Sequence, residues 1–101
     1  MRVYISGAIT GTDDFMERFN KAEERLTKEG LSVINPAHAN SYMPEDTKYE
    51  EYMKVAFCLL DLCDGIYMMK GWEKSCGANR EYGYALAKNM TVMFESPGRR
   101  Q

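Results

Sequence analysis

The chain has 101 residues, of which 45% are hydrophobic and 28% are charged, and its formal net charge is -2. This length supports one domain with a single core, and these proportions exclude a disordered or fibrous protein. Because the basic residues are scattered along the chain rather than clustered, a nucleic-acid duplex is not expected as a partner.

No apolar run reaches the length of a membrane span, and the first predicted strand begins directly at Arg2. We therefore expect a cytoplasmic protein with no membrane partner. The three cysteines, Cys58, Cys63 and Cys76, are odd in number and show no C-x-x-C spacing. This pattern favours reduced thiols, and we expect neither a bound metal nor a cofactor.

The chain begins with a predicted strand and helix. Arg2–Ser6 (RVYIS) is typical of a buried strand, and the following loop, Gly7–Gly11, permits a ligand to approach the backbone closely. The loop lacks both the G-x-G-x-x-G and the P-loop patterns, which argues against dinucleotide binding and against NTPase activity. Asp13 or Asp14 is expected to cap a helix that ends at Gly30.

A second strand and helix follow. The strand is predicted over Leu31–Asn35 (LSVIN), and Pro36 forbids its extension. A long polar loop is expected over residues 36–46, and loops of this length in small domains are often functional. A capping-box pattern at residues 47–50 predicts a helix that runs to about residue 63.

The remaining elements form a strand, a loop, a helix and a final strand. Gly65–Met69 is an apolar strand, the loop holds the only tryptophan, Trp72, and the helix begins near Cys76. Thr91–Glu95 supplies the fourth strand, and residues 96–101 read as a frayed tail.

Strands that alternate with helices predict one α/β domain over residues 1–95, with a parallel four-stranded sheet and right-handed crossovers. We expect the strand order 2-1-3-4 of a flavodoxin-like three-layer sandwich. Ligands of such sheets bind past the carboxyl ends of the strands where the order reverses, here between the first and third strands. The loops at Gly7 and Gly71 should meet at this crevice.

Glu81 is the candidate for chemistry in the crevice. At roughly 100° per residue, it lies within about 60° of the apolar stripe of its helix, and this places it toward the crevice. A half-buried carboxylate must be hydrogen-bonded or take part in chemistry, because burial makes the free ion costly. The alternative is a surface glutamate that pairs with Arg80 or Lys74, and helical geometry alone does not separate the two.

Several other groups point to a ligand. Tyr4 and Ser6 share one face of the first strand and can reach the mouth of the crevice. Trp72 can stack on a base or cover the rim of the core. A helix start with a hydroxyl and backbone N–H groups suits a phosphate, although the hydroxyl can equally serve as a cap. This helix start comprises Ser75, Gly77 and Ala78.

Four short segments carry a recognisable family pattern. They are YISG at 4–7, NPA at 35–37, CDGI at 63–66 and GWEKSCGA at 71–78, with Glu81 and Ala85 following the last. On these residues nearly the whole chain resembles the nucleoside 2-deoxyribosyltransferase-like family. The resemblance is to its small members, which include the 2′-deoxynucleoside 5′-phosphate N-hydrolases and compact domains of unassigned function.

The resemblance implies cleavage of the N-glycosidic bond of a deoxyribonucleoside or its 5′-monophosphate, by hydrolysis or transfer, in a homodimer. Glu81 would attack C1′ and form a glycosyl-enzyme ester, as in retaining glycosidases. Tyr4 would orient that carboxylate or contact the sugar. The predicted substrate-binding residues are Ser6, Gly7, Gly71, Trp72, Ser75, Gly77 and Ala78, the last three for a 5′-phosphate.

One position departs from the family pattern. The relatives carry an aspartate eight residues before the counterpart of Asp64, where it helps to protonate the leaving base, and here that residue is Ala56. Such general acid assistance is typically worth about 10²- to 10⁴-fold. Asp61 is the nearest substitute, but it lies about 140° away around the helix at roughly 100° per residue. The second hypothesis is therefore a nucleotide-binding or sequestering protein with weak or no activity.

Overall fold

A computed structural model describes residues 1–9 and 13–95 of the chain. Its four strands form one parallel sheet in the order β2-β1-β3-β4, which confirms the predicted flavodoxin-like α/β fold. The strands are β1 (Arg2–Ser6), β2 (Ser32–Ile34), β3 (Gly65–Met68) and β4 (Thr91–Phe94), and the last three are slightly shorter than expected. The predicted tail at 96–101 and part of the glycine loop, residues 10–12, lie outside the described residues.

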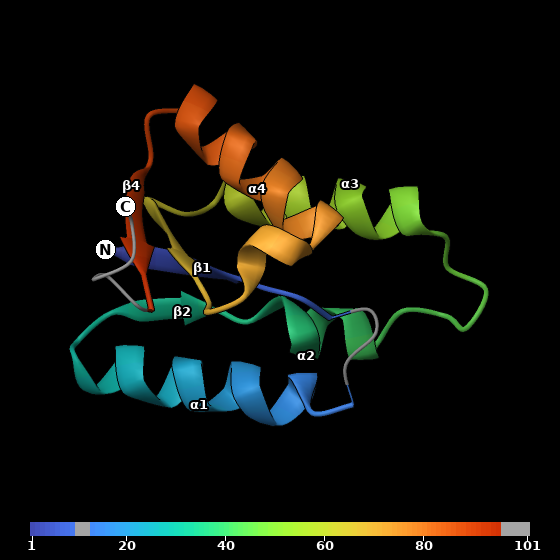
Figure 1. The fold of residues 1–101 in the computed structure, drawn as a ribbon, viewed down its shortest axis with the longest axis horizontal. Helices are drawn as coiled ribbons and strands as arrows, with labels where there is room; N and C mark the ends of the chain where they lie inside the picture. The colour runs from blue at the N-terminus through green and yellow to red at the C-terminus, as the bar shows by residue number, and fades with distance from the viewer. Residues whose placement is uncertain (10–12, 96–101) are drawn as a thin grey trace.

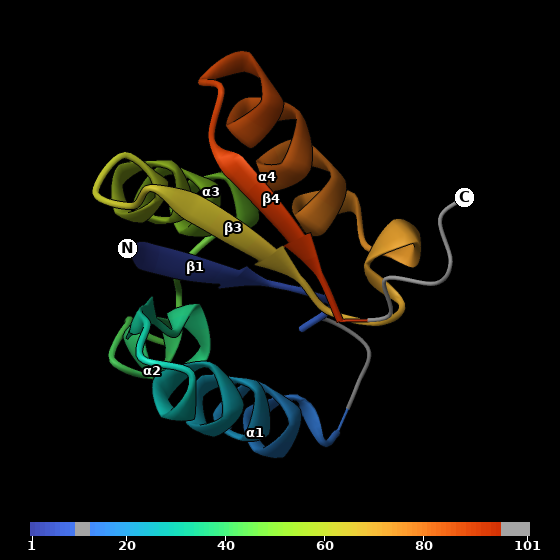
Figure 2. The same ribbon diagram turned by 90° about the vertical axis from the view of Figure 1, so that its left-hand side faces the viewer.

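Helices cover both faces of the sheet (Figures 1 and 2). α1 (Phe15–Lys28) and α2 (Pro36–Ser41) lie on one face, and α3 (Tyr49–Leu60) and α4 (Cys76–Ala87) lie on the other. A short 3₁₀ helix, η1 (Trp72–Lys74), connects β3 to α4. The predicted three-layer sandwich is therefore present.

Alternation along β1 divides the core between the two faces of the sheet. Val3 and Ile5 pack in the cluster that includes buried residues of α1, whereas Tyr4 packs in the cluster formed with α3 and α4. Ser6 shares the side of Tyr4, since both hydroxyls reach Glu81 on α4. The strand therefore presents two hydroxyl groups to the face that carries the candidate glutamate.

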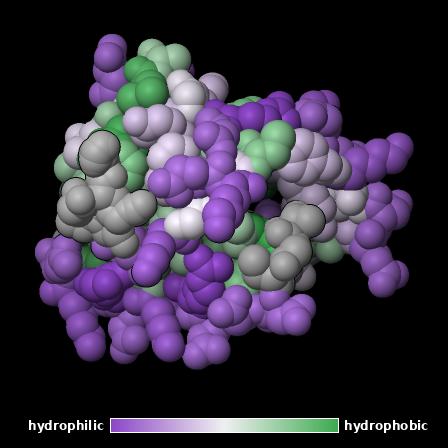
Figure 3. All heavy atoms as spheres, in the orientation of Figure 1, coloured by the Kyte–Doolittle hydropathy of each residue, from purple (hydrophilic) through white to green (hydrophobic). Residues whose placement is uncertain are grey.

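α1 is held to the sheet by its apolar stripe and is charged on its outer side. Phe19, Ala22 and Leu26 are buried at helical spacing. Exposed i,i+4 ion pairs, Glu17–Lys21 and Glu24–Lys28, lie on the outer side. Figure 3 shows the resulting band of hydrophilic side chains along the lower edge of the molecule.

The polar segment after β2 is a helix, and the prediction of a loop over residues 36–46 was wrong for its first half. The side chain of Asn35 accepts a hydrogen bond from the Ala37 N–H at 3.0 Å and caps α2. Pro36 occupies the first helical turn, where its missing N–H costs nothing and its fixed φ suits the helix. Proline thus ends the strand and begins a helix at the same point.

α3 begins one residue later than the predicted capping box implies. Lys48 is the N-cap residue, and its backbone N–H donates to Oε1 of Glu51 at 2.8 Å. The capping pair is therefore Lys48 and Glu51, and the predicted pair of Thr47 and Glu50 was wrong. This start places Tyr49 in the first turn of α3, which ends at Leu60 rather than near residue 63.

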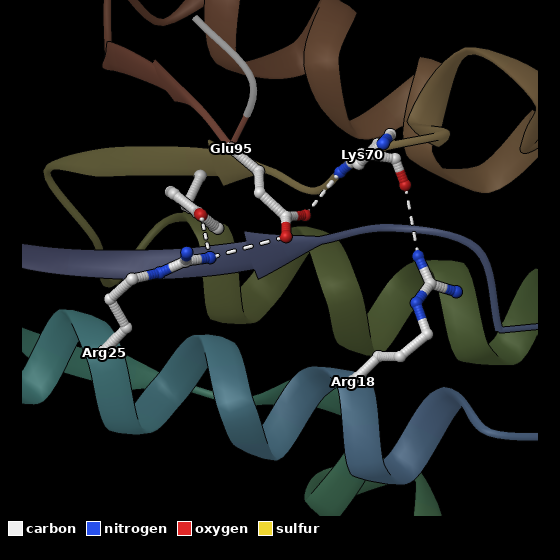
Figure 4. Close-up of polar contacts among 5 residues, drawn as sticks. Arg18, Arg25, Lys70 and Glu95 are labelled. Atoms are coloured by element: carbon white, nitrogen blue, oxygen red, sulfur yellow. Dashed lines mark hydrogen bonds and ion pairs between the residues drawn. The ribbon is translucent and has the colours of Figure 1, made fainter.

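A polar network ties α1 to the carboxyl ends of β3 and β4 (Figure 4). Glu95 accepts a hydrogen bond from the backbone N–H of Lys70 at 2.7 Å and pairs with the guanidinium of Arg25 at 3.4 Å. Arg25 also donates to the hydroxyl of Tyr67 at 2.7 Å, and Arg18 donates to the carbonyl of Lys70 at 3.1 Å. One carboxylate therefore joins a helix, a strand end and the loop after β3.

Replacing Glu95 with alanine should lower the free energy of unfolding by about 1 kcal/mol, because it removes a charge-assisted hydrogen bond to the backbone. Urea denaturation measures this difference. Glu24→Ala is the control, since Glu24 and Lys28 pair at 3.8 Å with both side chains largely exposed and such pairs contribute little. Equal losses for the two variants would contradict a special role of Glu95.

Candidate active site

The candidate site lies where β2 stops and β1 continues. The pairing of β1 with β2 ends at Tyr4 and Ile34, and Pro36 has no N–H with which to extend the ladder. Beyond this point a cavity of about 310 Å³ opens along β1, and both helical layers contribute to its wall. A crevice is therefore present at the carboxyl end of the sheet, but its predicted position between the first and third strands was wrong, because among the described residues none of β3 and not Gly71 lines it.

The wall of the cavity is apolar on the side of α1 and carries polar groups from the other three helices and from β1. The α1 and α2 residues are Phe15, Met16, Phe19, Pro36, Ala37, Asn40 and Ser41. The α3 and α4 residues are Tyr49, Tyr52, Met53, Ala56, Leu59, Gly77, Ala78 and Glu81. The strand β1, the loop after it and the residue before α4 add Tyr4, Ile5, Gly7, Ile9 and Ser75.

Glu81 is buried in this wall, with only 8% of its surface exposed. The hydroxyl of Tyr4 donates to Oε2 at 2.8 Å, and the hydroxyl of Ser6 donates to Oε1 at 2.6 Å. The predicted orientation toward the crevice is confirmed. The alternative of a surface ion pair was wrong, because the guanidinium of Arg80 binds Glu50 at 3.0 Å instead.

Burial is the main cause of the shifted pKa values of Glu81 and Tyr4. It raises the pKa of Glu81 from 4.5 to about 7, although the hydrogen bonds from Ser6 and Tyr4 lower it. Burial and the charge of Glu81 raise the pKa of the Tyr4 phenol well above its ordinary value. Tyr4 therefore remains a donor, while the carboxyl group titrates near neutral pH, as groups in active sites often do.

The raised pKa of Glu81 makes the stability depend on pH. Between pH 4.5 and about 7 the folded state holds a proton that the unfolded state releases, so the free energy of unfolding falls as the pH rises. Above that window, the ionised Glu81 lowers the free energy of unfolding by its full amount, roughly 3 kcal/mol. Glu81→Gln should therefore stabilise the protein at pH 8 much more than at pH 5. Urea denaturation at both pH values tests this, and an equal difference at the two would contradict it.

Most of the predicted substrate-binding residues lie in the cavity wall together with Glu81. Ser6 does not line the cavity, but its hydroxyl donates a hydrogen bond to Oε1 of Glu81. A Cβ atom on Gly7 would lie 2.9 Å from Sδ and 3.0 Å from Cβ of Met69, so a larger residue at the end of β1 would require Met69 to shift. The predicted residues that line the cavity directly are Tyr4, Gly7, Ser75, Gly77, Ala78 and Glu81.

The start of α4 serves as a cap and still borders the cavity. The hydroxyl of Ser75 accepts a hydrogen bond from the Ala78 N–H at 3.1 Å, so the capping role that the sequence allowed is present. This bond engages one of the N–H groups predicted for a phosphate. The Ser75 hydroxyl and Gly77 remain at the cavity wall, beside the positive end of the helix dipole.

Gly71 and Trp72 lie outside the cavity wall. The indole ring of Trp72 packs against Tyr82 and Phe94, with centroid distances of 4.8 and 6.3 Å. Of the two interpretations of Trp72, the structure supports the one in which it covers the core. Gly71 adopts a φ of 87° and turns the chain into η1, a conformation that favours glycine.

Both aspartates near Ala56 in sequence are engaged elsewhere. Asp61 accepts a hydrogen bond from the hydroxyl of Tyr84 at 2.6 Å, and Asp64 accepts one from the backbone N–H of Arg2 at 2.9 Å. Neither lines the cavity, whereas Ala56 does. Asp61 therefore does not replace the aspartate that the family resemblance implied at position 56.

Apart from Ala56 and the segment NPA at 35–37, the sequence did not single out the wall residues of α1, α2 and α3. Phe15 and Phe19 have the spacing of an ordinary apolar helix stripe, and Asn40 fell in the loop expected over residues 36–46. The pair Asn35–Pro36, a capping residue before a proline, was the available signal for α2. No pattern in the sequence distinguished the cavity-lining Tyr52 from an ordinary aromatic residue of α3.

Fold and site together define a flavodoxin-like α/β domain whose first strand ends at a cavity with a buried, hydrogen-bonded glutamate. Residues 1–94 match the family described as Domain of unknown function (DUF4406), and the chain belongs to that family. No curated protein matches the chain.

Within residues 1–9 and 13–95, no three His, Cys, Asp or Glu side chains gather in a way that could hold a metal ion. In the same part of the chain, no helix combines the length and the apolar character needed to cross a membrane.

Proposed function

We propose that this protein cleaves the N-glycosidic bond of a deoxyribonucleoside or its 5′-monophosphate, with Glu81 as the nucleophile. The observation that carries the proposal is the geometry of Glu81, a buried carboxylate in a cavity wall with each oxygen held by a hydroxyl of β1. A carboxylate fixed in this way suits attack on a sugar carbon whose transition state is oxocarbenium-like. The resemblance to the nucleoside 2-deoxyribosyltransferase-like family supports the same role.

The chemistry requires Glu81 in its ionised form. As the bond from C1′ to the base breaks, a carboxylate oxygen forms an ester with C1′, and water or a second base then cleaves that ester. Tyr4 and Ser6 keep the carboxylate in place and moderate its proton affinity through their hydrogen bonds. Because the pKa of Glu81 is about 7, the ionised fraction is substantial at neutral pH.

The cavity suits a nucleoside in size and in polarity. Its volume of about 310 Å³ is at the lower end of the ~300–1,000 Å³ range of small-molecule sites. The sugar would lie beside Glu81, and a 5′-phosphate would face Ser75 and Gly77 at the start of α4. A flat base would then lie against the apolar side chains of α1, with Asn40 near its polar edge. A homodimer, which the family resemblance implies, belongs to the same proposal.

Incubation of the protein with a panel of deoxynucleosides and their 5′-monophosphates tests the proposal. Chromatography should detect free base together with deoxyribose or its 5′-phosphate. The corresponding ribonucleotides test whether the cavity tolerates a 2′-hydroxyl group. Absence of free base from every member of the panel at high protein concentration would overturn the enzymatic function.

A second candidate function is nucleotide binding without turnover, and Ala56 is the observation that favours it. Ala56 lines the cavity at the position where the family resemblance implies an acid, so a ligand could bind and remain intact. Calorimetry should then measure binding that Glu81→Gln leaves unchanged, with the ligand recovered whole. Recovery of cleaved ligand would reject this candidate.

A further inference from the structure

We propose that Tyr52 protonates the leaving base, an inference that rests on the proposed glycosidic function. Tyr52 lines the cavity from α3. It lies four residues before Ala56, and positions i and i+4 of a helix share one face. Its side chain therefore stands one helical turn from the position where the resemblance implied an acid, on the same wall.

Among the described residues of the cavity wall, the other hydroxyl groups have partners or lie away from the proposed position of the base, and this leaves Tyr52 as the donor. Tyr4 donates to Glu81 at 2.8 Å, and Ser41 donates to the carbonyl of His38 at 2.6 Å. The guanidinium carbon of Arg80 lies 5.6 Å from the centroid of the Tyr49 ring, and the hydroxyl of Tyr49 interacts with Cys76 and Arg80.

Ser75 borders the cavity at the start of α4, where the proposal places a phosphate rather than the base. In contrast, the hydroxyl of Tyr52 makes no hydrogen bond within residues 1–9 and 13–95. The side chain is half-buried, so a bound base would shield its proton from bulk water. A phenol is an established type of general acid in enzymes.

The carboxylate of Glu81 forms a bond to C1′, the bond from C1′ to the base nitrogen breaks, and its electron pair stays with the base. The phenolic proton of Tyr52 moves to a ring nitrogen or carbonyl oxygen of that base, which leaves neutral. The water that then attacks C1′ gives one proton back to the phenolate, and its hydroxyl group becomes part of the sugar while Glu81 is released.

Tyr52→Phe tests the inference, because it removes one hydroxyl and keeps the ring in the cavity wall. Two substrates are compared: deoxyguanosine 5′-monophosphate and its 7-methyl derivative, whose positively charged base leaves as a neutral molecule without a proton. We expect kcat/KM for the unmethylated substrate to fall at least about tenfold, with less than about a twofold change for the methylated one. Tyr42→Phe, at a side chain that is 88% exposed, is the matched control and should change neither.

The outcomes separate this inference from the proposed function. If the wild type releases no base from either substrate, the glycosidic function itself fails, and the inference fails with it. If the wild type is active and Tyr52→Phe keeps full activity on the unmethylated substrate, only the role of Tyr52 is overturned. Equal losses on both substrates would also overturn it, since a structural effect would not depend on the leaving group.

Discussion

Glu81→Gln is expected to lower kcat/KM for base release by a factor on the order of 10⁴ or more, because an amide cannot form the ester with C1′. Glutamine preserves the size of the side chain and can still hydrogen-bond to the hydroxyls of Tyr4 and Ser6. The loss should therefore appear without loss of folding. Single-turnover measurement of free base, with calorimetry to confirm that substrate still binds, separates the chemical step from binding.

Glu24→Gln on the outer side of α1 is the matched control and should leave base release unchanged. The wild-type rate should also rise with pH and level off above about 7, where Glu81 is ionised. Base release that survives Glu81→Gln at near wild-type rate would assign the chemistry to another residue or to a contaminating enzyme.

Ala56→Asp is expected to increase kcat/KM for base release by about 100-fold, because it places a carboxylic acid beside the leaving base. Ala56 is 6% exposed and lines the cavity, so burial should raise the pKa of the introduced acid and keep it protonated. The variant should also be less stable than the wild type, since a buried polar group is costly unless it is hydrogen-bonded.

Ala56→Asn is the control for this gain, since the amide has the shape of the acid but has no acidic proton. A gain with Asp and none with Asn would show that the wild-type cavity is complete except for its strongest acid. If both variants bind nucleotide and neither releases base, the second candidate function, binding without turnover, gains support. The gain should be larger in the Tyr52→Phe background, because the introduced carboxylic acid would then supply the proton that Tyr52 no longer provides.

The fold could be predicted because its causes are local and repeated. Alternating strand and helix patterns allow few topologies once crossovers are right-handed, and the predicted order 2-1-3-4 is the observed one. Helical periodicity made the inward orientation of Glu81 one of two open interpretations, and α4 begins at Cys76 as expected. Whether Glu81 would be hydrogen-bonded could not be predicted, because its partners lie more than 70 residues away on β1.

The errors occurred where one residue has two opposite local effects or where tertiary packing decides. Pro36 ends a strand and also begins a helix, and only the first effect was considered. Trp72 could face a ligand or the core, and its contacts with Tyr82 on α4 and Phe94 on β4 are set by tertiary packing. The wall contributed by α1 and α2 could not be derived from periodicity, because the same apolar stripe can fill a core or border a cavity.

The composite wall of the cavity also determines how a ligand can be detected. Because helices from both layers border the cavity, the binding surface exists only while the whole sandwich is assembled. Ligand occupancy is thus linked to global unfolding, and a ligand at a hundredfold excess over its Kd would add about 2.7 kcal/mol to the stability. A shift in the melting temperature can therefore identify compounds that bind without being cleaved, independently of any assay for product.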